Sequence, residues 1–115
     1  MSDTTTTTIF RNIEIYNKAY FSVNLTLDNQ SVNMSFVWND KTKRYHATLV
    51  KTNGTIVFEG VAVNTLTDFP LNHSMFNNSL YGRFVLYPLD DGLVETDDTM
   101  KNWRDYYFLV YKITF

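Results

Sequence analysis

The feature that most constrains the fold of this chain is a two-residue alternation of apolar and polar side chains. Within residues 20–27, every second residue from Phe21 onward is apolar, whereas Ser22, Asn24 and Thr26 lie between them. Successive side chains of a β-strand point to opposite faces of a sheet. The pattern therefore predicts a strand with one buried face and one solvent-facing face.

The same alternation returns in residues 32–38, 44–51 and 55–63, and short turns rich in Asn, Asp and Gly separate these segments. Four strands joined by short turns predict an antiparallel meander. Residues 80–89 and 105–115 are also strand-like, and no stretch of ten or more residues has a convincing helical period. We therefore predict an all-β fold, a small antiparallel barrel or sandwich built on a β-meander with little or no helix.

The length of 115 residues predicts one domain, because two halves of this size could not each bury a useful core. Five consecutive threonines near the start have nothing to pack against, so residues 1–12 are predicted to form a flexible N-terminal arm. Residues 13–115 are then the single β domain. Within it, residues 64–79 are predicted to form a long loop.

The last predicted strand is apolar or aromatic on both faces, which is typical of a strand at the centre of a sheet or between two layers. One face of this strand can pack in the core, and the other face can be covered by the chain itself or by another subunit. The sequence leaves both possibilities open. Aromatic residues make up 17% of the chain and are favoured at interfaces. The residues predicted to contact a partner are Trp103, Tyr106, Tyr107, Phe108, Leu109 and Tyr111 near the C-terminus, and Phe69, Leu71 and Phe76 in the middle.

The charge pattern excludes several partners. A net charge of -2 and scattered basic residues give no general attraction to nucleic acid. No apolar run approaches the roughly 20 residues of a membrane span, so we expect no membrane partner. The absence of cysteine fits assembly in a reducing cytoplasm.

The sequence offers no catalytic constellation, so we predict no catalytic residue, no metal and no cofactor, and a protein that is not an enzyme. His46 and His73 are far apart and have no acidic or histidine partner at ligand spacing. The acidic residues within 90–98 are the best metal candidate, but their spacing does not match a calcium loop and favours a solvated turn. A carbohydrate- or receptor-binding module that uses Trp38, Tyr45 or Trp103 for stacking is the alternative function.

The order of segments resembles a known family, the small baseplate plug proteins of contractile-tailed bacteriophages of the cyanophage type. The likeness spans about residues 13 to 115 and rests on turn and strand motifs. These motifs are Ser35–Asp40, Tyr45–Leu49, Asn53–Thr55, Glu59–Val63, Thr67–Leu71, Ser79–Gly82 and Asn102–Trp103.

The resemblance implies a structural component of the virion at the distal end of the tail. It implies that the partners are other baseplate, hub and tail tube proteins, with several symmetric copies in each particle. The protein would be made in the cytoplasm of the host bacterium and would act through protein–protein contacts.

Overall fold

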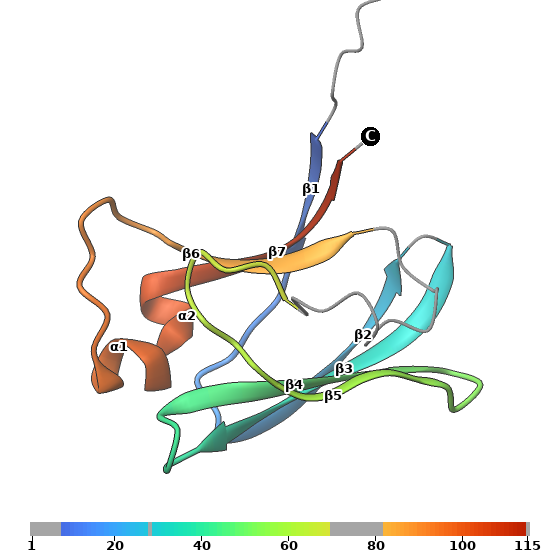
Figure 1. Cartoon of the computed structure of the whole chain (residues 1–115), viewed down its shortest axis with the longest axis horizontal. Helices are drawn as coiled ribbons and strands as arrows, with labels where there is room; N and C mark the ends of the chain where they lie inside the picture. Colours follow the sequence, from blue (N-terminus) through green and yellow to red (C-terminus); the bar gives the residue numbers. More distant parts are fainter. Residues whose placement is uncertain (1–7, 28, 70–81, 115) are drawn as a thin grey trace, which may run out of the picture.

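The computed structural model describes residues 8–27, 29–69 and 82–114, and these residues form two antiparallel sheets that pack face to face (Figure 1). The four-stranded sheet has the order β2-β3-β4-β5. Its strands are β2 (Tyr20–Leu27), β3 (Gln30–Asn39), β4 (Arg44–Lys51) and β5 (Ile56–Ala62). This is the predicted meander, and the sequence alternation set its register.

The inward residues of neighbouring strands lie opposite one another in this sheet. Phe21 pairs with Phe36, and Phe36 pairs with Ala47 on the next strand. All three are buried, whereas the intervening Ser, Asn and Thr side chains face away from the core. Asn29, in the turn between β2 and β3, has a φ of 62°, a left-handed conformation that Asn tolerates better than most residues.

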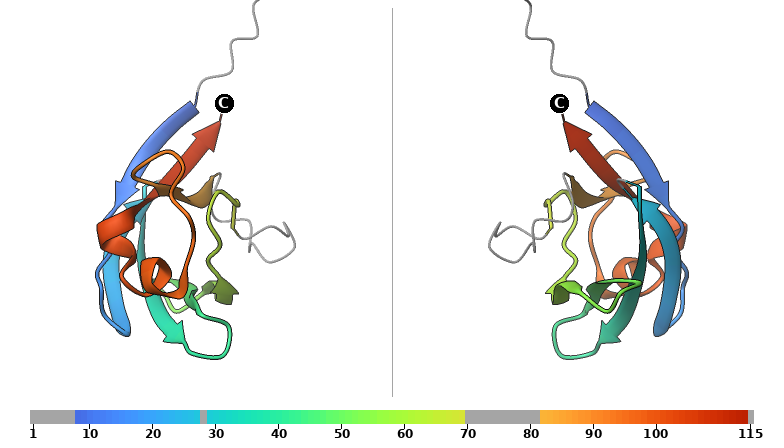
Figure 2. Two further views of the ribbon diagram at one scale, coloured as in Figure 1. Left: turned by 90° about the vertical axis from the view of Figure 1, so that its left-hand side faces the viewer. Right: turned by 90° about the vertical axis from the view of Figure 1, so that its right-hand side faces the viewer.

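The three-stranded sheet has the order β1-β7-β6, with β7 (Tyr107–Thr114) between β1 (Thr8–Ile13) and β6 (Arg83–Pro88). The central position of β7 agrees with the apolar character of both its faces. The predicted arm over residues 1–12 is wrong in its second half, because residues 8–12 pair with β7 in register from Thr8↔Thr114. Residues 1–7 lie outside the described part. The paired ends of β1 and β7 project beyond the body of the sandwich (Figure 2).

Two short helices, α1 (Asp97–Lys101) and α2 (Trp103–Tyr106), lie together at one end of the sandwich (Figure 1). The Thr96 side chain accepts a hydrogen bond from the Thr99 backbone N–H, and the Thr99 side chain bonds back to Thr96, so a capping box starts α1. The sheets do not close into a barrel. The fold is all-β and sandwich-like, as predicted, with little helix.

Aromatic rings fill the space between the two sheets. At the end of the sandwich that carries the helices, the ring of Trp103, the first residue of α2, stacks on the ring of Tyr45 with 4.2 Å between the ring centroids. Further along, Phe84 stacks on Phe69 at 5.5 Å and also contacts Phe58. Among the described residues, nine aromatic side chains are buried: Phe21, Phe36, Tyr45, Phe58, Phe69, Phe84, Trp103, Tyr107 and Tyr111. The high aromatic content thus serves the chain's own core to a large extent.

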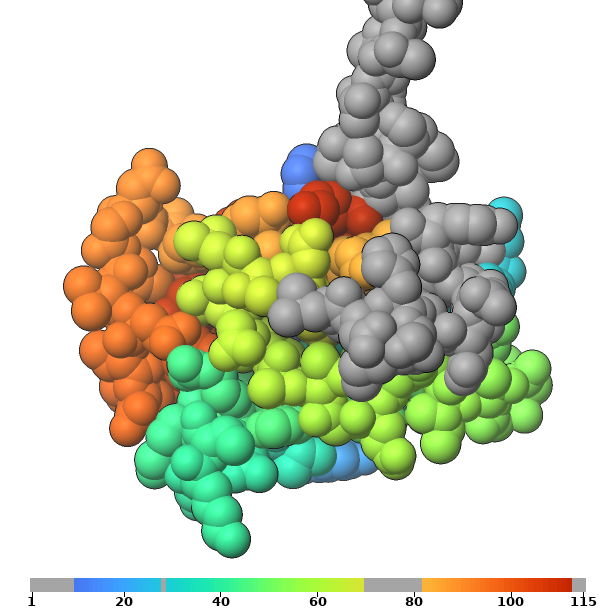
Figure 3. All heavy atoms as spheres, in the orientation of Figure 1, coloured from blue at the N-terminus to red at the C-terminus, as the bar shows by residue number. Residues whose placement is uncertain are grey.

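The described part of the connection between β5 and β6 closes one side of the sandwich. Residues 63–69 run along β6, with isolated bridges from Thr65 to Leu86 and from Phe69 to Phe84. In the space-filling view this segment, drawn in yellow-green, lies across the front of the molecule between the two sheets (Figure 3). The free edge of β6 is therefore covered, and Phe69 becomes part of the core.

Candidate interaction surface

The outer face of the three-stranded sheet leaves apolar side chains accessible, among them Phe10 and Phe108. Its inner side chains belong to the core, so the alternate residues must point outward. The outward residues are Phe10 and Asn12 of β1, Phe108, Val110 and Lys112 of β7, and Arg83, Val85 and Tyr87 of β6. Five of these eight residues are apolar or aromatic.

A hollow of about 340 Å³ lies on this face and is lined by Phe10, Asn12, Tyr87, Phe108 and Val110. Val110 is only 1% exposed and forms its floor, whereas Phe10 and Phe108 are 55% and 38% exposed. The Tyr87 ring contacts both of them, stacked on Phe108 at 5.5 Å and edge-on to Phe10 at 6.4 Å. The hollow is therefore an aromatic-walled site, and the side-chain amide of Asn12 is among its described lining.

One corner of the same face is basic. Phe10, Lys112 and Arg83 lie in one row across the three strands. Lys112 Nζ is 3.2 Å from Asp68 Oδ1, and both side chains remain partly exposed. Arg83 Nη1 donates to the Gly82 carbonyl at 3.0 Å, so this corner places two cations and one carboxylate next to the apolar hollow.

The structure divides the predicted interface residues into two groups. Phe108 lies on the outer face, and Tyr106 is partly buried at the end of α2. The structure places Phe69, Trp103, Tyr107, Leu109 and Tyr111 in the chain's own core, so these side chains are not available to a partner. Leu71 and Phe76 lie outside the described residues. Burial of one face of β7 by the other sheet is the physical reason for the difference.

The predicted stacking platform for a sugar is wrong for two of its three residues. Tyr45 and Trp103 are fully buried and stack on each other, so neither ring can meet a ligand in the folded state. Trp38 is partly exposed at the end of β3, and its Nε1 donates to Asp40 Oδ1 at 2.8 Å. A single ring of this kind does not make a platform.

Burial of the Tyr45 side chain is expected to make the protein less stable at alkaline pH. Its hydroxyl donates to the backbone carbonyls of Lys18 and Lys101, at 2.9 and 3.1 Å, and burial raises its pKa above 10.0. The unfolded chain then loses this proton at a lower pH than the folded chain. We expect the free energy of unfolding to fall as the pH rises above about 10. Urea denaturation at several alkaline pH values measures this, and Tyr45→Phe should show a weaker pH dependence.

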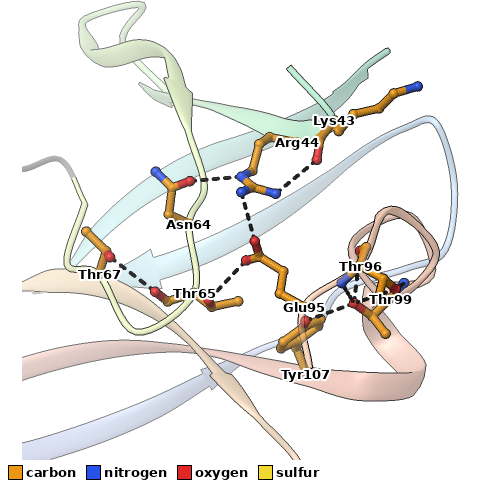
Figure 4. A network of polar contacts seen from close by, with 9 residues as sticks. All are labelled: Lys43, Arg44, Asn64, Thr65, Thr67, Glu95, Thr96, Thr99 and Tyr107. Carbon is orange, nitrogen blue, oxygen red and sulfur yellow. Dashed lines mark hydrogen bonds and ion pairs between the residues drawn. The ribbon is translucent and has the colours of Figure 1, made fainter. Parts of the chain in front are cut away.

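The acidic loop, residues 89–96, is held by polar contacts and does not gather its carboxylates around one point. Glu95 accepts from Arg44 at 2.8 Å and from the Thr65 hydroxyl at 3.1 Å, and Arg44 also donates to Asn64 (Figure 4). Next to it, the Tyr107 hydroxyl and Thr99 Oγ1 lie 3.0 Å apart. The network therefore fixes the base of the loop to β4 and to residues 64–65.

Two other kinds of feature are absent from the described residues. No group of three or more His, Cys, Asp or Glu side chains there could hold a metal ion. In the same part of the chain, no helix is long and apolar enough to cross a membrane. His46 is bonded to Thr42 Oγ1 and to the Gly60 carbonyl, and His73 lies outside the described residues.

Comparison with known families gives a match over nearly the whole chain. Residues 10–113 match the family described as cyanophage baseplate Pam3 plug gp18. A search of curated proteins finds no match. Because the family match covers far more than half of the sequence, the chain belongs to this family of phage baseplate plug proteins. The expected family is thereby confirmed, and with it a structural role in the phage baseplate.

Proposed function

We propose that this protein is a plug or hub-associated subunit of a contractile phage tail baseplate and acts through protein–protein contacts without catalysis. The observation that carries the proposal is the family match over residues 10–113. In this proposal, the partners are other baseplate, hub and tail tube proteins, and several symmetric copies assemble into each virion after synthesis in the host cytoplasm.

The outer face of the three-stranded sheet supports a role based on contacts. Exposed apolar patches on a folded domain mark sites of interaction more often than chance. Here the exposed side chains of Phe10 and Phe108 line the hollow around the buried Val110 and do not pack into the core. Removing these apolar side chains from water is favourable, so contact with a neighbouring protein that covers this face is stabilised.

Deletion of the gene tests the proposal. We expect tails made without this protein to lack a complete baseplate and to be non-infectious, and we expect the wild-type gene supplied in trans to restore both. Mass spectrometry and electron microscopy of purified tails provide the measurements. Tails that are complete and infectious without the protein, or that never contain it, would contradict the proposal.

A further inference from the structure

The apolar hollow and its basic corner have a chemical counterpart elsewhere on the same chain, in the acidic loop. Leu89 and Val94 of this loop are 55% and 73% exposed, and Val94 is the most exposed large apolar side chain described. The neighbouring Asp90 and Asp91 are exposed carboxylates. The loop therefore combines apolar side chains with negative charge, which is what the hollow and its basic corner would recognise.

We propose that copies of this protein contact one another head to tail, with the acidic loop of one copy docked on the outer face of the next copy. Apolar side chains of the loop, Val94 foremost, enter the hollow over Val110. The Asp90 and Asp91 carboxylates lie toward Lys112 and Arg83. The inference rests on the proposed function only in that the virion would hold several copies.

The acidic loop is held in place before it binds, which favours such a contact. The Leu89 N–H donates to the Tyr106 carbonyl at 2.8 Å, so the loop begins at a fixed point beside α2. At its other end, Glu95 is anchored by Arg44 and Thr65. A loop fixed at both ends loses little conformational entropy on binding, and a preorganised contact is correspondingly tighter.

The position of the two surfaces also decides the type of assembly. The acidic loop lies beside α1 and α2 at one end of the sandwich (Figure 1), whereas the residues that line the hollow belong to the outer face of the three-stranded sheet. Two different patches that fit each other make a heterologous contact, which continues from copy to copy and closes into a ring if the rotation allows. A two-fold dimer through the outer face alone would instead stop at two copies.

Cysteine cross-linking distinguishes these cases, because the natural sequence contains no cysteine. We would make Asn12→Cys on the wall of the hollow, Val94→Cys on the acidic loop, and the double variant. Each full-length protein would be oxidised in solution and in purified tails. The double variant should give a ladder of dimers, trimers and larger species on a non-reducing gel. Each single variant should stay monomeric, and a mixture of the two should give dimers only.

Charge reversal provides the second readout. Asp90→Lys with Asp91→Lys, in the cysteine background, should weaken the cross-linked ladder about tenfold or more, since opposed charges become like charges. Asp97→Lys with Asp98→Lys in α1 is the matched control and should leave the ladder unchanged. Unchanged thermal unfolding of each variant excludes misfolding as the cause.

Three results would overturn the inference: dimers from Asn12→Cys alone, which indicate a two-fold contact; cross-links from residue 12 in tails to a different protein; and no cross-link in tails that contain the protein. All three leave the proposed function intact. Absence of the protein from tails counts against the proposed function, and a ladder in solution would still support the head-to-tail contact.

Discussion

Replacing Trp103 by alanine is expected to lower the free energy of unfolding by about 3–5 kcal/mol, which is the usual cost of removing a buried aromatic ring. Trp103 is fully buried and contacts three aromatic rings. These rings are Tyr45 at 4.2 Å, Phe36 at 5.3 Å and Phe21 at 6.1 Å. Its Nε1 also donates to the Tyr16 carbonyl at 2.8 Å, and the substitution leaves that carbonyl without this partner.

The loss is large compared with the whole stability of a domain of this size, which is about 5–15 kcal/mol. Urea denaturation followed by tryptophan fluorescence or circular dichroism measures it. Trp38→Ala is the matched control, because the same residue type there is partly exposed and bonds to the exposed Asp40. We expect the Trp38 variant to lose far less. Equal losses in the two variants would contradict the position of Trp103 at the centre of the core.

The sequence was sufficient to predict the four-stranded sheet, because each of its strands has one polar and one apolar face. Alternation of this kind sets the strand, its register and its buried face together. Strand β1 was missed for the opposite reason. Each face of β1 mixes an apolar and a polar side chain: Phe10 lies with Asn12 on one face, and Ile13 lies with Arg11 on the other. Its pairing with β7 joins the two ends of the chain, and a local pattern cannot report such a contact.

The candidate surface could be predicted only in part, and the reason lies in β7. Aromatic side chains occupy both faces of this strand, as at Tyr107 and Phe108, so composition could not tell which face would meet the other sheet. The structure assigns Tyr107 to the core, where its hydroxyl meets Thr99, and Phe108 to the outside. The hollow itself combines side chains from three strands that are distant in the sequence. The sequence pattern therefore identified the right strand without identifying its accessible side.

Replacing Phe84 by alanine is expected to destabilise the protein by about 3–5 kcal/mol, because the ring is fully buried between the two sheets. Phe84 joins β6 to its surroundings through Phe69 at 5.5 Å, Tyr111 at 5.0 Å and Phe58 at 5.9 Å. Its removal leaves a cavity where β5, β6 and β7 meet. Urea denaturation measures the loss, and Phe84→Leu should recover part of it by refilling the space.

Phe108→Ala is the matched control, since it removes the same side chain from the opposite face of the same sheet. Phe108 is partly exposed and its main ring contact is with Tyr87, so we expect a loss of about 1 kcal/mol or less. Its effect should appear in assembly, because the wall of the hollow is lost while the fold remains. A Phe108 variant that is as unstable as the Phe84 variant would show that the outer face is needed for folding. A stable Phe108 variant that no longer enters tails would show that the ring is kept exposed for contact with a neighbour.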